Sequence, residues 1–283
     1  MRGSKKISRS RYGNAIIFSI LGIFGAFMAL PIVYAIIQSF KPLDEIFIFP
    51  PRFFVRRPTI DNFTMLFQLT SNLWVPFTRY IFNSLFVTVT GTIFHVLFAS
   101  MAAFPLAKYK FPGSKAMFNI VVMALLFTPQ VTYIPLYVVL ARMNMINTYG
   151  SLILPSLAGS LGLFLMKQNI LMIPDSFIEA AKIDGASEYK VYRKVIMPMV
   201  KPAWLTLTIF TFQALWNNGG VTFVYNESLK VLPTVMSQIA SGGIARAGVG
   251  AAASVFLMIP PILVFLLTQG NIIETMSHSG IKE

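Results

Sequence analysis

One polar interval divides the second half of this chain: Glu179-Ala180-Ala181-Lys182-Ile183-Asp184-Gly185-Ala186-Ser187, continuing to Met197-Pro198 and Lys201-Pro202. Two apolar runs flank it, residues 150–173 before it and residues 202–215 after it. These runs carry almost no charge. Whether they lie in a membrane or in the core of a soluble domain therefore decides where the polar interval lies. That environment follows from the composition of the whole chain.

The composition excludes an ordinary soluble domain. Of the 283 residues, 55% are hydrophobic and only 12% are charged, and the mean hydropathy is +0.69. Soluble domains carry about 25% charged residues, and apolar runs of about 20 residues match a bilayer core of about 30 Å. The sequence predicts an all-α integral membrane protein with six transmembrane helices: residues 14–40, 80–107, 116–140, 150–173, 202–215 (starting a few residues earlier) and 251–268.

The basic residues predict the orientation in the membrane. Residues 1–12 contain five basic and no acidic side chains, and the apolar run after them is too long for a signal peptide. With both termini in the cytoplasm, the inner segments, counted together with Lys167 at the inner end of the fourth run, carry 15 Lys and Arg and the outer segments carry 8, together the 23 of the chain. This bias follows the positive-inside rule. Because the charge lies between the apolar runs, the net charge of +13 does not indicate nucleic-acid binding.

The chain divides into two parts by this pattern. Residues 1–79 form the cytoplasmic N-terminus, the first transmembrane helix and an external loop. Residues 80–283 form the core domain with helices 2–6, and the polar interval, at about 174–202, is its cytoplasmic loop. Prolines such as Pro129 interrupt the third run, and neighbouring helices or a water-lined path must satisfy the freed backbone groups.

The residue types exclude several chemistries. No cysteine is present, so disulfides, thiolate metal sites and Cys nucleophiles are ruled out. With only His95 and His278 we expect no metal site, and we identify no catalytic residue. No Gly-x-x-x-x-Gly-Lys-Ser/Thr motif occurs, so the chain has no ATP-binding loop of that kind. The runs also lack the carboxylates typical of ion-coupled carriers.

Local signals in the polar interval predict two short helices. Ser176 and Glu179 have capping-box spacing, Gly185 sits where a helix can end in a left-handed conformation, and Ser187 can cap a second helix running to Pro198. In that second helix Tyr189, Tyr192, Ile196 and Met199 have the spacing of one face. The small side chains of Ala180 and Ala181 allow another protein to approach closely. Two interpretations remain open: a docking surface for a partner, and an amphipathic loop anchored to anionic lipid.

Polar residues in or beside the runs are candidates for a substrate pathway. Gln130 next to Pro129 is the best of them, because a broken helix exposes backbone groups to a cavity. The alternative for each is a hydrogen bond between helices, or an interfacial anchor in the case of Trp216. For His95, near Gly91, Thr92 and Ser100, a helix contact is favoured over a pathway. The pathway candidates are Asn83, Thr128, Gln130, Tyr133, Gln213, Trp216 and Asn217.

The polar interval resembles the "EAA" loop of ABC-importer permeases. Glu179-Ala180-Ala181 is followed after three residues by Gly185 and after nine more by Val195-Ile196-Met197-Pro198. Further similarity to the carbohydrate-importer branch, of the maltose-transporter G-subunit kind, extends over nearly the whole chain: Ser39-Phe40-Lys41-Pro42, Glu45-Ile46-Phe47 with Pro50-Pro51, Asn62-Phe63, Ile134-Pro135-Leu136-Tyr137 and Ala214-Leu215-Trp216-Asn217. Two stretches depart from the family pattern: Trp216-Asn217-Asn218-Gly219-Gly220, and the tail around residues 269–276.

The resemblance implies a type I ABC importer permease fold (MetI-like) and transport by alternating access. It implies a second homologous permease subunit, two copies of an ATPase that use ATP and Mg, an extracytoplasmic sugar-binding (lipo)protein, and a carbohydrate substrate, an oligosaccharide or polysaccharide fragment. The chain itself would bind no cofactor and would lie in a bacterial plasma membrane. The alternative is a polytopic scaffold or channel that works without an ATPase. The residues that would couple to the ATPase are Glu179, Ala180, Ala181, Asp184, Gly185, Ala186 and Pro198.

Overall fold

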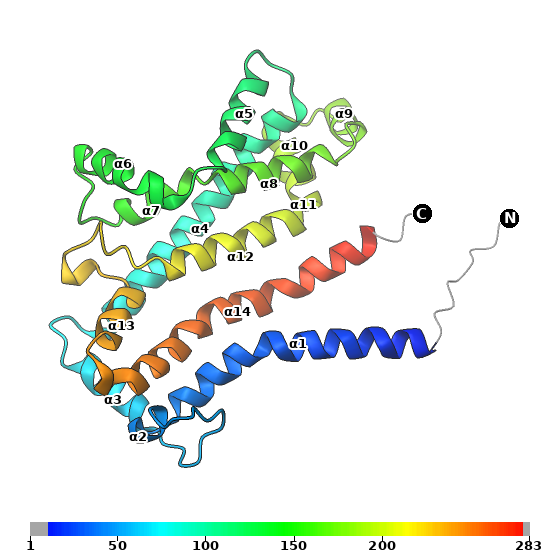
Figure 1. Cartoon of the computed structure of the whole chain (residues 1–283). Helices are drawn as coiled ribbons and strands as arrows, with labels where there is room; N and C mark the ends of the chain where they lie inside the picture. The colour runs from blue at the N-terminus through cyan, green and yellow to red at the C-terminus, as the bar shows by residue number, and fades with distance from the viewer. Residues whose placement is uncertain (1–10, 280–283) are drawn as a thin grey trace. The chain divides into compact units, whose positions relative to one another are not determined.

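The computed structural model describes residues 11–279, and every regular element in this part of the chain is a helix (Figure 1). The basic segment 1–12 and the end of the tail lie largely or wholly outside the described residues. Four helical segments are long and apolar enough to cross a membrane: Tyr12–Ser39 in α1 (Arg11–Ser39), α4 (Phe77–Lys108), the α7–α8 segment Gly150–Leu171, and Ile244–Gly270 in α14 (Ala247–Ser279). They confirm the first, second, fourth and sixth predicted spans.

The third predicted span is not one continuous helix. The structure divides it into α5 (Ser114–Ala124) and α6 (Pro129–Arg142), which Figure 1 draws as separate helices. Thr128 is extended, with φ −78° and ψ 147°. A proline disfavours helical geometry in the residue before it and is well suited to the first turn of a helix. Pro129 therefore starts a new helix, and the interruption that this proline predicted within the run 116–140 is confirmed.

The fifth predicted run is α12 (Lys201–Asn217), which begins one residue before Pro202, where the sequence predicted a start a few residues before it. The helical segment before it, Glu188–Met199, meets α12 at a bend of 80°. The polar interval is therefore connected to the fifth apolar helix through a sharp corner at Val200. The remaining elements are α9 (Ser176–Ile183), α10 (Glu188–Val191), the π-turn η1 (Tyr192–Ile196), α11 (Met197–Met199), α13 (Leu232–Ala240) and the 3₁₀ turns η2 (Glu227–Leu229) and η3 (Ile244–Arg246).

The described chain packs as two compact units. One contains the described residues through Leu69 together with Ile239–Phe256. Its loop after α1, with α2 (Leu43–Ile46) and α3 (Asp61–Ser71), is organised by buried polar groups. The Lys41 ammonium donates to the Arg52 carbonyl at 2.5 Å, and the Asn62 amide donates to the Ser39 and Lys41 carbonyls at 2.9 and 2.7 Å. The division of the chain at residue 79 stays a prediction.

The other unit contains Thr70–Gln238 and the described residues from Leu257 onward. In it α7 (Gly150–Leu157), α8 (Ser160–Leu171) and α12 pack against α4 (Figure 1). His95 of α4 lies in a notch formed by two glycines: a Cβ on Gly159 would approach His95 Cε1 to 2.6 Å, and a Cβ on Gly162 would approach Nε2 to 2.2 Å. The helix contact that the sequence favoured for His95 is therefore observed.

Candidate functional site

The first helix of the polar interval starts without the expected capping box. Asp175 already has helical geometry, with φ −66° and ψ −23°, and no side-chain cap bond is made there. Ser176 consequently lies inside the first turn and not at the flanking position that a capping side chain needs. The Asp175 carboxylate instead accepts from the Lys108 ammonium at 2.7 Å. The capping-box prediction for Ser176 and Glu179 was therefore wrong.

The corner at Gly185 is as predicted. Its φ of +76° lies in the left-handed region, which favours glycine because no Cβ is present. The Gly185 amide donates to the Lys182 carbonyl at 3.0 Å, and the Ala186 amide donates to the Ala181 carbonyl at 2.9 Å. This pair of bonds is a Schellman motif, which satisfies the last carbonyls of a helix. Asp184 provides the residue just before the corner and is exposed.

The second predicted helix begins with its expected cap but is not regular. The Ser187 hydroxyl accepts from the Lys190 amide at 3.4 Å. After α10 the chain forms the π-turn Tyr192–Ile196, which adds a residue to the turn and shifts the faces of the helix. Tyr192 and Ile196 are buried, whereas Tyr189 is 63% exposed and Met199 40%. The single face expected for these four residues is therefore not formed.

Helix α9 has a buried edge and an exposed face. Ile178 is buried, and Ala181 packs with Ala186 against a core cluster that includes Val191 and Ile196. On the other side Ala180 is exposed and Ile183 has 87% of its surface exposed. Small and apolar side chains on an exposed helix face allow a partner to approach closely. Glu179, Gly185 and Pro198 are likewise exposed, so all the predicted coupling residues except Ala181 and Ala186 lie largely at the surface.

Two charged side chains connect the two helices of this loop. The Lys182 ammonium forms an ion pair with the Glu188 carboxylate at 2.7 Å, and the Tyr109 hydroxyl donates to the same carboxylate. Hydrogen bonding to Glu188 raises the pKa of Lys182. Burial, followed by the hydrogen bond with Glu188, raises the pKa of Tyr109. All three groups therefore keep their paired protonation states near neutral pH.

The pathway candidates fall into two groups. Two are buried and hold the structure together: the Asn83 amide donates to the Ser228 and Lys230 carbonyls at 2.9 and 2.8 Å, and Trp216 donates to the Leu257 carbonyl at 2.9 Å. Asn83 also accepts from the Tyr149 hydroxyl at 2.7 Å. The others have exposed side chains: Thr128, Gln130, Tyr133, Gln213 and Asn217.

The exposed candidates lie at breaks and clefts. Thr128 and Gln130 flank Pro129 at the break between α5 and α6, as the sequence predicted for this proline. Gln213 lines a cleft of about 200 Å³ between α12 and α14. The Tyr133 hydroxyl donates to the Thr222 hydroxyl at 2.8 Å, and Asn217 is the last residue of α12.

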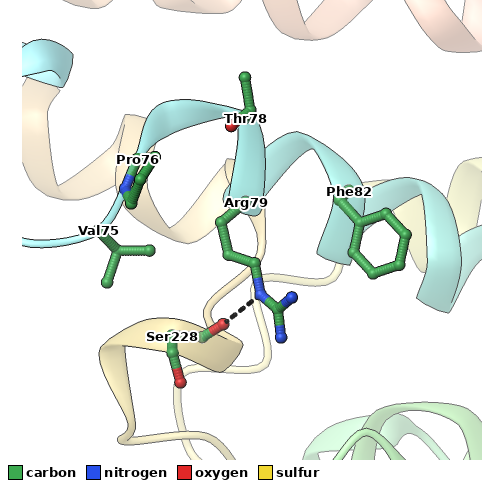
Figure 2. A pocket seen from close by; sticks show the side chains of 6 residues that line it. All are labelled: Val75, Pro76, Thr78, Arg79, Phe82 and Ser228. Atoms are coloured by element: carbon green, nitrogen blue, oxygen red, sulfur yellow. Dashed lines mark hydrogen bonds between the residues drawn. The ribbon is translucent and has the colours of Figure 1, made fainter.

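Two hollows contain residues that the sequence did not single out. One hollow, of about 520 Å³, lies at the start of α4 (Figure 2). In it the Arg79 guanidinium donates to the Ser228 carbonyl at 3.3 Å and lies 5.6 Å from the centre of the Phe82 ring. Arg79 and Phe82 are three residues apart in the sequence, which places them on the same face of a helix. That spacing was the signal in the sequence for this hollow. The other, about 550 Å³, is mostly apolar and has four polar lining residues: His95, Ser156, Thr211 and Asn218. Within residues 11–279 no three His, Asp or Glu side chains are grouped to hold a metal.

Comparison with known proteins identifies the family. Residues 95–278 match the family of binding-protein-dependent transport system inner membrane components. The chain belongs to this family. The matched region contains the whole polar interval and the last four apolar runs, so the EAA-loop resemblance is confirmed. This family member is a multi-pass membrane permease subunit.

Curated relatives match between about three quarters and nearly all of the chain. The arabinooligosaccharides transport system permease protein AraQ of Halalkalibacterium halodurans is 26% identical over 92% of this chain and 93% of its own length. The diacetylchitobiose uptake system permease protein NgcG of Streptomyces coelicolor is 28% identical over 97% and 91%. Protein LplC of Bacillus subtilis is 33% identical over 77% and 72%.

Solved structures share the fold. A chain of a bacterial ABC transporter involved in the import of the acidic polysaccharide alginate superposes with a TM-score of 0.74, at 20% identity, over 95% of this chain and 99% of that one. A chain of the MetNI methionine ABC transporter, in an inward-facing conformation, gives a TM-score of 0.52 at 18% identity over 70% and 95%. The predicted all-α, MetI-like permease fold is confirmed.

Proposed function

We propose that this chain is one of two homologous permease subunits of a bacterial ABC importer for an oligosaccharide or a polysaccharide fragment. The names of the relatives support a carbohydrate substrate, since two of them refer to oligosaccharide or chitobiose uptake. An extracytoplasmic sugar-binding lipoprotein would deliver the sugar. The chain would lie in the plasma membrane, in contact with lipid, with both termini in the cytoplasm.

The polar interval is the proposed docking surface for the ATPase. The observation that supports this role best is the division of α9 into a buried edge at Ile178 and an exposed face at Ala180 and Ile183. A helix that only lay on lipid would need no small residue at the centre of its exposed face. Two copies of an ATPase, which bind ATP and Mg, would occupy this face on the two permeases and drive alternating access.

The proposed sugar contacts are the five candidates with exposed side chains: Thr128, Gln130, Tyr133, Gln213 and Asn217. Amide and hydroxyl groups bind sugar hydroxyls, and an aromatic ring packs against the apolar face of a pyranose. Asn83 and Trp216 are left out, because backbone carbonyls of this chain already use their amide and indole donors. A ligand screen on the associated binding protein would identify the sugar.

The docking role is tested by co-purification from the native membrane. Tagged wild-type chain should bring an ATPase with it, and Gly185→Asp should lose this ATPase or hydrolyse ATP without uptake. Gly113→Asp is the matched control: Gly113 also has a positive φ, +87°, and open space around its missing side chain, but it lies outside the loop. Absence of any ATPase with the wild-type chain would favour a scaffold or channel. Unchanged uptake in Gly185→Asp would refute docking at this corner.

A further inference from the structure

The end of α4 is attached to the polar interval by an unusually buried lysine. Only 5% of the Lys108 side chain is exposed, whereas lysines are almost never fully buried unless they are paired. Its ammonium donates to the Ile173 carbonyl and to the Asp175 carboxylate, the latter at 2.7 Å. Both partners lie between the end of α8 and the start of α9. Lys108 therefore fastens α4 to the point where the chain enters the polar interval.

The next residue makes a second attachment. The Tyr109 hydroxyl donates to the Glu188 carboxylate at the start of α10. The Lys182 ammonium, at the end of α9, forms the 2.7 Å ion pair with Glu188 and lies 4.9 Å from the centre of the Tyr109 ring. The Tyr109 ring also packs edge-on against Phe104 of α4 at 5.5 Å. One tyrosine thus contacts both helices of the interval and the helix from which it projects.

A third contact joins Ser100 and Phe104, which lie earlier in α4, to Tyr192 of the π-turn. The Ser100 and Tyr192 hydroxyls are 2.7 Å apart, and the Phe104 and Tyr192 rings are 5.9 Å apart. Side chains from the last turns of α4 therefore contact the polar interval at its beginning, at the start of α10 and at the π-turn. These contacts join residues that are 65 to 92 positions apart in sequence.

The covalent connection to the fifth apolar helix is less direct. Between α10 and α12 the chain passes through the π-turn and then the 80° bend at Val200. π-Turns and sharp bends interrupt the regular hydrogen-bond ladder of a helix, so the covalent path carries a displacement of α9 to α12 only around this corner. Ile178 of α9 and Ala203 and Leu207 of α12 also belong to one buried apolar cluster. The displacement reaches α4 through side chains in direct contact.

We propose that Lys108 and Tyr109 are positioning residues that connect the docking loop to α4, so that movement of the loop by a bound ATPase moves the second transmembrane helix. The proposal rests on the ATPase docking proposed above. The contacts made by Lys108, Tyr109, Lys182 and Glu188, defined here as the clasp, stay closed throughout the transport cycle. The clasp makes α4 move with the loop as one body.

Uptake per ATP hydrolysed, measured on purified complexes in lipid vesicles, tests the clasp. Tyr109→Phe keeps the ring under Lys182 and removes only the hydroxyl, and we expect this ratio to fall about two- to fivefold, the range for loss of one exposed charged contact. Lys108→Met removes a buried charge with two partners, and we expect a fall of about tenfold. The control Lys110→Met removes a neighbouring exposed lysine and should leave the ratio unchanged.

A charge reversal separates coupling from folding. Lys182→Glu should lower the ratio, and adding Glu188→Lys should restore most of it, because the ion pair is remade with opposite polarity. Complexes that contain the ATPase but show unchanged ratios in Tyr109→Phe and Lys108→Met would overturn the proposal. Loss of the ATPase from the wild-type complex would instead refute the docking role, so the two failures are distinguishable.

A cross-link tests whether the clasp stays closed. The chain contains no cysteine, so Tyr109→Cys with Glu188→Cys can be joined by a short bismaleimide without background reaction within this subunit. A permanently closed clasp should support uptake better than the same double variant left unlinked. Lower uptake after cross-linking would show that the clasp must open, and would overturn the proposal even if the single variants fold poorly.

Discussion

Replacing Gly162 by alanine tests the contact between α4 and α8. An added Cβ would lie 2.2 Å from His95 Nε2, 2.8 Å from His95 Cε1 and 3.2 Å from the Ala99 Cβ. His95 is 4% exposed and Gly159 limits the ring on a second side, so the hollow of about 550 Å³ that His95 lines is the space left for the imidazole to move into. Either α4 and α8 separate or the ring leaves its position. Overpacking of this kind costs about 1–3 kcal/mol.

The melting temperature of the purified subunit in detergent, followed by fluorescence-detected size exclusion, measures this cost. At about 2–4 °C for each kcal/mol in a chain of roughly this size, Gly162→Ala should lower the melting temperature by roughly 2–12 °C. Gly25→Ala is the matched control, since Gly25 is also helical and has no atom within 4 Å of an added Cβ. It should leave the protein as stable or slightly more stable.

A second-site change decides whether the cost arises at His95. His95→Ala in the Gly162→Ala background removes the atoms that the new Cβ meets, so the double variant should be more stable than the two single effects added together predict. If Gly162→Ala melts like Gly25→Ala, the close packing of α4 on α8 is refuted. If it is destabilising but His95→Ala gives no recovery, the notch around His95 is refuted.

Three further outcomes follow from the buried polar contacts. Asn83→Leu keeps the volume but leaves two carbonyls and a hydroxyl without their partner, and should destabilise the subunit by about 2–4 kcal/mol, read as a lower melting temperature. Trp216→Phe should destabilise by about 1–3 kcal/mol and leave the order of preference among transported sugars unchanged; an altered order would return Trp216 to the sugar pathway. Burial raises the pKa of Glu227, but hydrogen bonds from Lys230 and Tyr80 outweigh it and lower the pKa. The ionised carboxylate therefore adds stability above its unfolded pKa, roughly 4.3, and loses it as the pH falls through the lower folded pKa. When the pH is lowered from 6 to about 3.5, the melting temperature of the wild-type protein should fall further than that of Glu227→Gln.

Local signals were reliable where one residue decides a backbone conformation. Gly185 ends α9 in the left-handed region, and Ser187 caps α10, because both effects involve neighbours within a few residues. The same kind of reasoning was wrong at Ser176. Asp175 continues the helix backwards and its carboxylate binds Lys108, a residue 67 positions away that no local rule considers.

The roles of the pathway candidates depended on distant partners in the same way. Asn83 and Gln130 are both amide-bearing candidates in the sequence. The structure places backbone carbonyls from residues 228 and 230 around Asn83 and leaves Gln130 exposed beside the helix break. The signal for the break was local, since Pro129 lacks a backbone donor. Asn83 is buried by a contact with a residue about 145 positions away, and spacing along the chain does not reveal such a contact.

By itself the sequence determined that this protein is helical, crosses the membrane several times and carries a polar, EAA-like loop between its fourth and fifth apolar runs. Hydropathy, proline, glycine and charge placement act through the bilayer and the local backbone, so a single chain suffices to predict them. Only the tertiary structure decided which polar groups are used within the fold and which are exposed, and that Lys108 and Tyr109 hold the loop to α4. Those assignments depend on contacts between residues that are far apart in the sequence. A buried charge or amide binds whichever partner the folded chain places beside it, and spacing along the sequence does not reveal that partner.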